Sequence, residues 1–141
     1  MPHPTDAQLV QQAIEARTHA YAPYSNFTVG AALLAKDGTI YCGANIENAA
    51  FGPSNCAERT AFFTAVYAGA RDFEAIAIIG GKAGEAAEDG PLCGPCGVCR
   101  QVMAEFCKPD FRILLARGNG TWEETTLAAL LPYSFTPADL Q

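Results

Sequence analysis

NCAERTAFF, residues 55–63, places a cysteine, an acid and an arginine in the first turn of an expected helix. Asn55 and Glu58 have the spacing of a capping box, an ordinary signal for the start of a helix. That interpretation leaves Cys56 and Arg59 unexplained. An arginine in a first turn faces the positive end of the helix dipole, which costs a few tenths of a kcal/mol up to about 1 kcal/mol. Violations of this kind often mark functional sites.

A second pattern, PCGVC at residues 95–99, supplies Cys96 and Cys99 at a spacing of three. On a helix this spacing puts both sulfurs on one side, about one turn apart, and a first turn favours their thiolate forms. Alone, the pair also fits a redox dithiol or two buried cysteines. Cys56 favours a metal site, because two helix starts that meet at one sheet edge bring three thiolates together. Three protein ligands leave the fourth position of zinc open for water.

A closed structural zinc site is the alternative, and it needs a fourth protein ligand. Cys93 is the candidate, since it forms a second pair with Cys96 at a spacing of three. It precedes Gly94 in an expected loop, outside the helix, so we rank it below the three-cysteine site. Cys42 and Cys107 are expected to be buried apolar residues.

Glu58 and Arg59 both acquire roles beside such a metal. A carboxylate near the metal that is not a ligand can take a proton from bound water and deliver it to a leaving group. Three thiolates and one Zn²⁺ sum to a charge of −1, which weakens the acidity of the bound water. A guanidinium that donates hydrogen bonds to a thiolate withdraws this excess charge, which accounts for Arg59 in an unfavourable first turn.

The composition fits one globular domain, residues 1–141, since half of the residues are apolar. A formal net charge of −6 with nine scattered basic residues disfavours a nucleic-acid partner. No apolar run approaches the roughly 18 residues needed to cross a bilayer, and the first residues lack the regions of a signal peptide. We therefore expect a cytoplasmic protein with no membrane partner. In such a protein six cysteines bind metal or react more often than they form disulfides.

The hydrophobic pattern predicts alternating helices and strands. A capping box of Thr5 and Gln8 starts a helix, and an Asp-Gly turn joins two strand-like runs. Two later apolar runs indicate strands that are covered on both faces. The expected helices are 5 to about 20, about 56–67 and about 96–107, and the expected strands are 28–35, 39–44, 73–80 and 111–116. This order predicts a mixed sheet with helices on both faces.

Cys56-Ala57-Glu58 together with Pro95-Cys96-Gly97-Val98-Cys99 matches the three-cysteine variant of the zinc deaminase signature. Beyond this signature the chain resembles the small homotetrameric cytidine deaminases over nearly its whole length. The resemblance rests on five segments in the same order: YAPYSNFTVGAALL (21–34), GANIENAAFG (43–52), CAERTA (56–61), GPCGVCRQVM (94–103) and LLPYSFTPADL (130–140).

The resemblance implies an α/β protein with a three-layer α/β/α fold and a mixed sheet of about five strands. It implies one Zn²⁺ per subunit, bound by Cys56, Cys96 and Cys99, with Glu58 as the proton shuttle. Water activated by zinc would attack C4 of the pyrimidine while Glu58 protonates N3, and ammonia would leave. The implied reaction converts cytidine and 2′-deoxycytidine to uridine and 2′-deoxyuridine in pyrimidine salvage.

The resemblance also implies the contacts to the nucleoside. Asn45 and Glu47 resemble the pair that hydrogen-bonds the ribose 3′-hydroxyl, and their amide and carboxylate groups suit hydroxyls. Phe27 resembles the aromatic residue beside the nucleoside, and Ala57 the residue whose backbone N–H meets the base. The positions that match residues contributed by neighbouring subunits are Ala49, Phe51 and Phe135, the last of which would stack on the pyrimidine.

Two other functions remain open at this point. A deaminase of a related aminopyrimidine nucleoside, such as an antibiotic of the blasticidin type, shares the zinc and glutamate motifs. A zinc-stapled interaction module without catalysis would close its metal with four protein ligands. The acidic chain has no phosphate-cradling loop, so we expect an uncharged nucleoside as the substrate.

Overall fold

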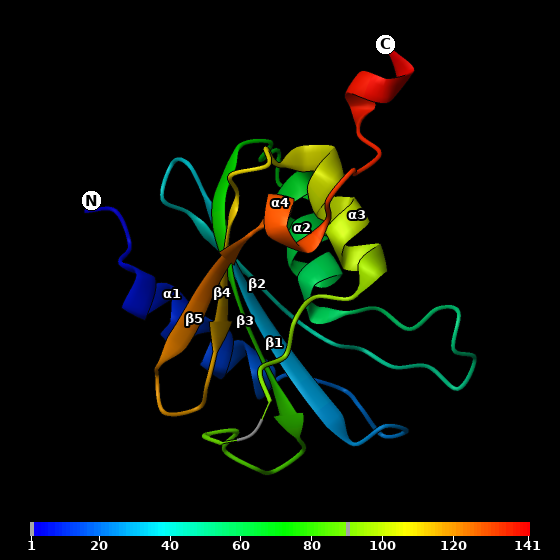
Figure 1. The fold of residues 1–141 in the computed structure, drawn as a ribbon. Helices are drawn as coiled ribbons and strands as arrows, with labels where there is room; N and C mark the ends of the chain where they lie inside the picture. The colour runs from blue at the N-terminus through cyan, green and yellow to red at the C-terminus, as the bar shows by residue number, and fades with distance from the viewer. Residues whose placement is uncertain (1, 90) are drawn as a thin grey trace.

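The computed structural model of the protein describes residues 2–89 and 91–141 and shows three layers, helix, sheet and helix (Figure 1). One five-stranded sheet lies in the middle, with α1 on one face and α2, α3 and α4 on the other. The elements in chain order are α1 (Asp6–Arg17), β1 (Phe27–Ala35), β2 (Ile40–Ala44), α2 (Ala57–Tyr67), β3 (Phe73–Lys82), α3 (Gly97–Phe106), β4 (Arg112–Ala116), β5 (Trp122–Thr126), α4 (Leu127–Leu130) and a final 3₁₀ turn, η1 (Pro137–Leu140).

The sheet has the strand order β2-β1-β3-β4-β5 and is mixed, as the sequence predicts. Only β3 and β4 run parallel within the described sheet, and α3 forms the crossover between them. The other neighbours are antiparallel, and β1 and β2 form the predicted hairpin around Gly38, whose φ of 93° suits glycine. This topology brings the first residues of β1 beside the last residues of β3, where Phe27 pairs with Lys82.

Two hydrophobic clusters fill the spaces between the layers. The cluster between the sheet and α2 and α3 is built around Phe62, Ile76, Ile78, Met103 and Ile113, all fully buried. The cluster under α1 joins Leu9, Val10 and Ala13 to the other side of the same strands. Because β3 and β4 are covered on both faces, nearly every residue of these strands is apolar.

The capping box predicted for α1 is present, with Thr5 and Gln8 bonding each other's backbone. The capping-box interpretation of Asn55 and Glu58 is wrong. Helix α2 has Cys56 as its N-cap, without a capping hydrogen bond from the side chain, and Asn55 donates to the Thr60 hydroxyl instead. The first turn of α2 is thus free of ordinary capping side chains.

Helix α2 lies very close to strand β2. A Cβ added to Gly43 would come within 2.4 Å of the Ala57 carbonyl oxygen and 2.5 Å of the Ala61 nitrogen. Only glycine permits this approach, which places the start of α2 directly over the sheet. The expectation that Cys42, the preceding residue, is buried is wrong, because β2 is an edge strand and Cys42 is exposed on its other face.

The chain ends in a tail that leaves the body of the molecule beyond α4 (Figure 1). Among the described residues, one hydrogen bond joins residues 132–141 to the rest of the chain, from Gln101 Nε2 to the Phe135 carbonyl oxygen at 2.8 Å. Tyr133 and Phe135 are exposed. None of the helices in the described ranges has both the length and the apolar character that a membrane-spanning segment needs.

Candidate metal centre and active site

Three cysteine sulfurs meet where α2 and α3 begin. The sulfurs of Cys56 and Cys96 are 3.8 Å apart, those of Cys96 and Cys99 are 3.4 Å apart, and all three lie within 4.8 Å of one another. Tetrahedral zinc with metal–sulfur bonds of about 2.3 Å separates its sulfurs by about 3.8 Å. The three side chains therefore have the chemistry and the spacing of a zinc site.

The helix starts explain why these cysteines converge. Cys56 is the N-cap of α2 and Cys96 is the N-cap of α3, whose sulfur accepts from the Cys99 backbone N–H at 3.5 Å. The positive ends of both helices thus face the same point, where they stabilise thiolates. Cys99 is almost completely buried, whereas Cys96 is exposed at the mouth of the site.

Arg59 lies beside this cluster, as the charge argument predicts. Its Nη2 donates to the Cys56 sulfur at 3.2 Å. Hydrogen bonds from Cys99 and Arg59 lower the pKa of the Cys56 thiol to about 5, while the bond to Cys56 and burial raise the pKa of Cys99. The buried Nε of Arg59 has no partner within the described residues. The Arg59 guanidinium is therefore held beside the cysteine sulfurs, although its burial there leaves the Nε–H without a hydrogen bond.

Glu58 is the buried charged side chain of the described core, with 4 % of its surface exposed. Burial raises the pKa of its carboxyl to about 7. A carboxyl with such a pKa can both take and give a proton near neutral pH, which general acid–base catalysis requires. Ala57, the neighbouring residue predicted to meet the base, is fully buried at the first position of α2.

A hollow of about 370 Å³ opens beside the sulfur cluster. Its wall unites residues from β1, from the loop between β2 and α2, from the first turn of α2 and from the segment before α3. The lining residues are Val29, Asn45, Glu47, Phe51, Ser54, Asn55, Cys56, Ala57, Glu58, Arg59, Cys93, Gly94 and Cys96. Most of the predicted site residues therefore share one concave surface.

The side chain of Asn45 crosses from the end of β2 to β1. Its Oδ1 accepts from the Val29 N–H at 2.8 Å, and its Nδ2 donates to the Phe27 carbonyl oxygen at 2.9 Å. Each end of the amide retains one further hydrogen-bonding site, since the oxygen has a second lone pair and the nitrogen a second hydrogen. Asn45 therefore fixes the wall of the hollow and still presents polar atoms there.

Glu47 is held by a turn that the sequence analysis did not connect with the site. Its Oε1 accepts from the N–H groups of Tyr24 and Ser25, and its Oε2 accepts from the Ser25 hydroxyl. These bonds, above all that of the Ser25 hydroxyl, lower the pKa of Glu47. The contact spans more than twenty residues of sequence, so only the fold reveals Ser25.

Three predicted substrate residues lie outside the wall of the hollow in this single chain. Phe27 stands at the start of β1 with 41 % of its surface exposed. Its ring lies near Gly80, where an added Cβ would be 2.9 Å from Phe27 Cε2 and 2.7 Å from the Cys93 sulfur. Ala49 is exposed in the loop before α2, and Phe135 lies in the projecting tail.

The closed four-cysteine site is not supported. Cys93 lines the hollow, but it does not belong to the described group of sulfurs that could hold one metal ion. Its thiol faces the Gly94 carbonyl oxygen at 3.9 Å, and burial raises its pKa to about 11. Within the described residues, the metal cluster thus has three cysteines.

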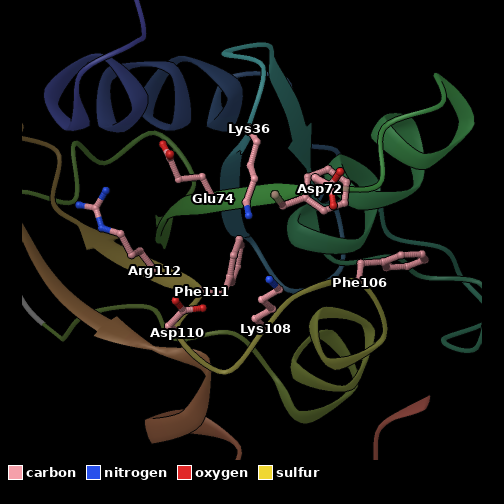
Figure 2. A pocket seen from close by; sticks show the side chains of 9 residues that line it. Lys36, Asp72, Glu74, Phe106, Lys108, Asp110, Phe111 and Arg112 are labelled. Carbon is pink, nitrogen blue, oxygen red and sulfur yellow. The ribbon is translucent and has the colours of Figure 1, made fainter. Parts of the chain in front are cut away.

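Another hollow, of about 230 Å³, lies at the opposite end of the parallel strands, where β3 and β4 begin (Figure 2). In Figure 2 the ends of Lys36 and Lys108 are directed toward each other beside Phe111. Three cationic and three anionic side chains line it, so the lining favours neither anions nor cations: Lys36, Lys108, Arg112, Asp72, Glu74 and Asp110. The catalytic chemistry is concentrated in the hollow at the sulfur cluster.

A family profile described as the cytidine and deoxycytidylate deaminase zinc-binding region matches residues 3–115, which include all three cysteines and Glu58. The chain belongs to this family. Zinc is accordingly the cofactor, and the sulfur cluster is a group of side chains that could hold one ion.

Relatives match this deaminase over nearly its full length. A cytidine deaminase from Sporosarcina psychrophila is 53 % identical over 133 residues, which cover 94 % of this chain and 93 % of the relative. The crystal structure of a cytidine deaminase from Burkholderia pseudomallei has a TM-score of 0.84 at 46 % identity, covering 94 % of this chain and 100 % of that chain. A blasticidin-S deaminase from Bacillus cereus is 33 % identical and covers 93 % of this chain and 92 % of the relative.

Proposed function

We propose that the protein catalyses hydrolytic deamination of cytidine and 2′-deoxycytidine to uridine and 2′-deoxyuridine, with release of ammonia, in pyrimidine salvage. The observation that carries this proposal is the buried carboxyl of Glu58 beside the three-sulfur cluster, in a hollow open to solvent. Cytidine deaminases with about half of their residues identical to this chain support the substrate class.

The chemistry follows from the groups that meet in the hollow. Zinc bound by Cys56, Cys96 and Cys99 would supply a nucleophile at neutral pH by lowering the pKa of water. Glu58 would carry one proton of that water to N3, and would then carry the second proton, from the hydroxyl that the attack places on C4, to the departing amino group. Arg59 donates to the Cys56 sulfur and so offsets the excess negative charge of three thiolates.

The wall of the hollow offers donors and acceptors for the nucleoside. Ala57 is the first residue of α2, so its backbone N–H has no partner within the helix and is available to the base. Glu47, kept ionised by its three donors, accepts from the ribose 3′-hydroxyl, and Asn45 presents its remaining polar atoms to the same sugar. Phe27 packs beside the nucleoside.

We infer that the active enzyme is a homotetramer in which neighbours complete each site. Large apolar side chains are exposed on α2 and in the tail, including Phe63, Tyr67, Tyr133 and Leu140, and a second copy of the chain would cover them. Ala49 and Phe135 lie in exposed segments from which they can enter a neighbour's hollow, where Phe135 stacks on the pyrimidine. Phe51 is also exposed and lines the hollow of its own chain, so a contribution of Phe51 to a neighbour requires the two hollows to meet at the interface.

Three further proposals concern the whole chain. Residues 1–141 act as one catalytic domain, because a single sheet joins the two hydrophobic clusters and carries the site. The three thiols must stay reduced to bind zinc, which supports a cytoplasmic location. The net charge of −6 supports a small-molecule substrate rather than a nucleic acid.

A second candidate substrate is an aminopyrimidine nucleoside antibiotic of the blasticidin type. The similarity to the Bacillus cereus blasticidin-S deaminase favours it, although at lower identity than the cytidine deaminases. A comparison of kcat/KM separates the two. A preference of orders of magnitude for blasticidin S over cytidine would replace the proposed substrate.

The proposed reaction is tested by following the ultraviolet change and the ammonia released when the pure protein is incubated with cytidine, with and without a chelator. Glu58→Gln is expected to keep its zinc and its fold and to lose at least about 10²-fold in kcat, the usual scale for a general acid–base group. Unchanged turnover in this variant would remove Glu58 from the mechanism. No deamination by the wild-type protein with zinc bound would favour a non-catalytic zinc module.

A further inference from the structure

Arg17, the last residue of α1, joins three segments with one guanidinium. Its Nε donates to the carbonyl oxygen and the hydroxyl of Thr28 at 3.1 and 2.9 Å, at the start of β1. Its Nη2 donates to the Lys82 carbonyl oxygen at 2.7 Å, where β3 ends, and its Nη1 donates to that of Glu85 at 2.8 Å, in the segment that follows. Arg17 therefore fixes how the chain leaves β3.

Two glycines make room for this arrangement. A Cβ on Gly81 would lie 2.8 Å from Nη2 of Arg17, and a Cβ on Gly30 would lie 2.4 Å from the Arg17 backbone nitrogen. Cβ atoms in proteins do not approach other atoms this closely, so β1 and β3 both need glycine at these positions, where Arg17 packs. The Thr28 hydroxyl also donates to the Gly81 carbonyl oxygen at 3.3 Å, which ties the two strand ends together under the guanidinium.

The same strand ends form the floor of the zinc site on the opposite face. Side chains alternate along a strand, so the neighbours of Thr28 and Gly81 face the other way. Val29 lines the hollow, and Gly80 is the residue against which the Cys93 sulfur packs. Arg17 and the hollow at the cysteine cluster therefore lie on opposite faces of the same two strands.

The segment after β3 is held at a second point before it returns to the site. The Gly118 N–H donates to the Ala87 carbonyl oxygen at 2.8 Å, and a Cβ on Gly118 would lie 1.6 Å from the Ala86 carbonyl oxygen. Arg17 and Gly118 thus fix residues 82–87 against the face of the sheet that α1 covers. Further along the chain, Cys93 and Cys96 line the hollow on the other face.

We propose that Arg17 is a positioning residue of the zinc site. It holds the segment that follows β3, so that the sulfur of Cys96 stays close to the sulfurs of the other two cysteines. Cys96 is exposed and precedes α3, whereas Cys99 is locked in the interior. On the α3 side Cys96 is held through the buried Pro95, whose carbonyl oxygen accepts from Arg100 Nε at 2.8 Å, so Arg17 would supply the hold on the β3 side. The inference rests on the proposed function only in that the three cysteines bind zinc.

The test measures how fast zinc leaves the purified holoenzyme, using a chromophoric chelator, beside the midpoint of thermal unfolding. Arg17→Met should release zinc about tenfold faster, at the lower end of the 10- to 100-fold effects of residues that support metal ligands. Arg17→Lys keeps the charge but cannot make four directed hydrogen bonds, so its rate of zinc release should fall between those of the wild type and Arg17→Met. Hydrogen exchange should rise in parallel at the Glu85 amide, which donates to the Lys82 carbonyl oxygen, and at the Gly118 amide, which donates to that of Ala87.

Arg71→Met is the matched control. Arg71 also donates to two carbonyl oxygens, those of Val66 and Ala70, but at the far end of α2. The Arg71→Met variant should have a lower midpoint of thermal unfolding and an unchanged rate of zinc release. Equal release rates in Arg17→Met and wild type, or equally fast release in Arg71→Met, would overturn the inference.

Gly81→Ala keeps the test decisive should Arg17→Met fail to fold. The added methyl group presses on both the Arg17 guanidinium and the Cβ of Ala87, in the segment that Arg17 holds, so zinc release should again be faster than in wild type. A wild-type rate would contradict the inference. The proposed function fails separately, when the zinc-bound wild-type protein does not deaminate cytidine, a result that leaves the comparison of zinc-release rates unaffected.

Discussion

Arg59 Nη2 donates a hydrogen bond to the Cys56 sulfur over 3.2 Å, across the first turn of α2. This bond resolves the conflict between a cation and the positive end of a helix dipole, because the thiolate gives the cation a closer partner. The arginine and the cysteine therefore work as one unit in the metal centre.

Replacing Arg59 by glutamine should weaken zinc binding or turnover about 10- to 100-fold, the usual effect of removing a group that supports a metal ligand. The reason is the uncompensated charge of three thiolates. Zinc affinity by competition with a chelator and kcat for cytidine measure the effect. Arg71→Gln, which changes an arginine remote from the cluster, should retain wild-type values. Full activity in Arg59→Gln would show that the hydrogen bond to Cys56 is dispensable.

Cys93→Ala should keep one zinc ion per chain, because the Cys93 sulfur lies outside the three-sulfur cluster. Metal content after gel filtration measures this directly. Cys99→Ala is the matched comparison and should lose its zinc, since it removes a member of the cluster. Loss of zinc from Cys93→Ala would restore the closed four-cysteine site.

Gly43→Ala should destabilise the protein by about 1–3 kcal/mol, the usual cost of overpacking. The new methyl group would press on the Ala57 carbonyl oxygen and move the start of α2 away from the sheet. The free energy of unfolding from urea titration measures the change. Gly97→Ala is the control, because a Cβ there has open space within a helix, and it should be neutral or slightly stabilising. Equal stability of both variants would refute the close contact.

Ser25→Ala should raise the pKa of Glu47 toward its ordinary value. The Ser25 hydroxyl is the strongest of the donors that lower this pKa, so in the wild type the carboxylate stays ionised at more acidic pH than a free glutamate. Removing the hydroxyl makes protonation begin at higher pH as acid is added. Carbon-13 NMR titration of the side-chain carboxyl measures both values. A titration unchanged by the substitution would show that the hydroxyl does not bond to Glu47.

Phe135→Ala and Glu58→Gln should each abolish most activity, yet mixed tetramers of the two should recover some. Each recovered site takes Glu58 from one chain and Phe135 from its neighbour. Random assortment of equal amounts gives about one quarter of the wild-type sites. Cytidine turnover after joint unfolding and refolding measures the recovery. A mixture that stays inactive would place Phe135 within its own chain's site or outside the site altogether.

Local patterns predicted most of the architecture. The apolar runs at residues 73–80 and 111–116 became β3 and β4, and the capping box at Thr5 marked the start of α1. The end of β3 was placed too early, because Gly80-Gly81 reads as a strand terminator. The strand continues to Lys82, since the two glycines leave space for Cys93 on one face and Arg17 on the other.

The meeting of the three cysteines could be predicted because their spacing and their positions at helix starts are local properties of the chain. The partners of Asn45 and Glu47 could not, because Val29 and Ser25 reach them only after the strands pair. The place that we propose for Phe135 rests on contacts between chains, which no pattern within one sequence specifies.

The two hydrophobic clusters are built without any of the three zinc-binding cysteines. Most of the burial that drives the chain to its native topology therefore comes from side chains other than these cysteines. Newly synthesised protein in a zinc-starved cell would then accumulate as a folded, dormant reserve that a later supply of the ion switches on without refolding.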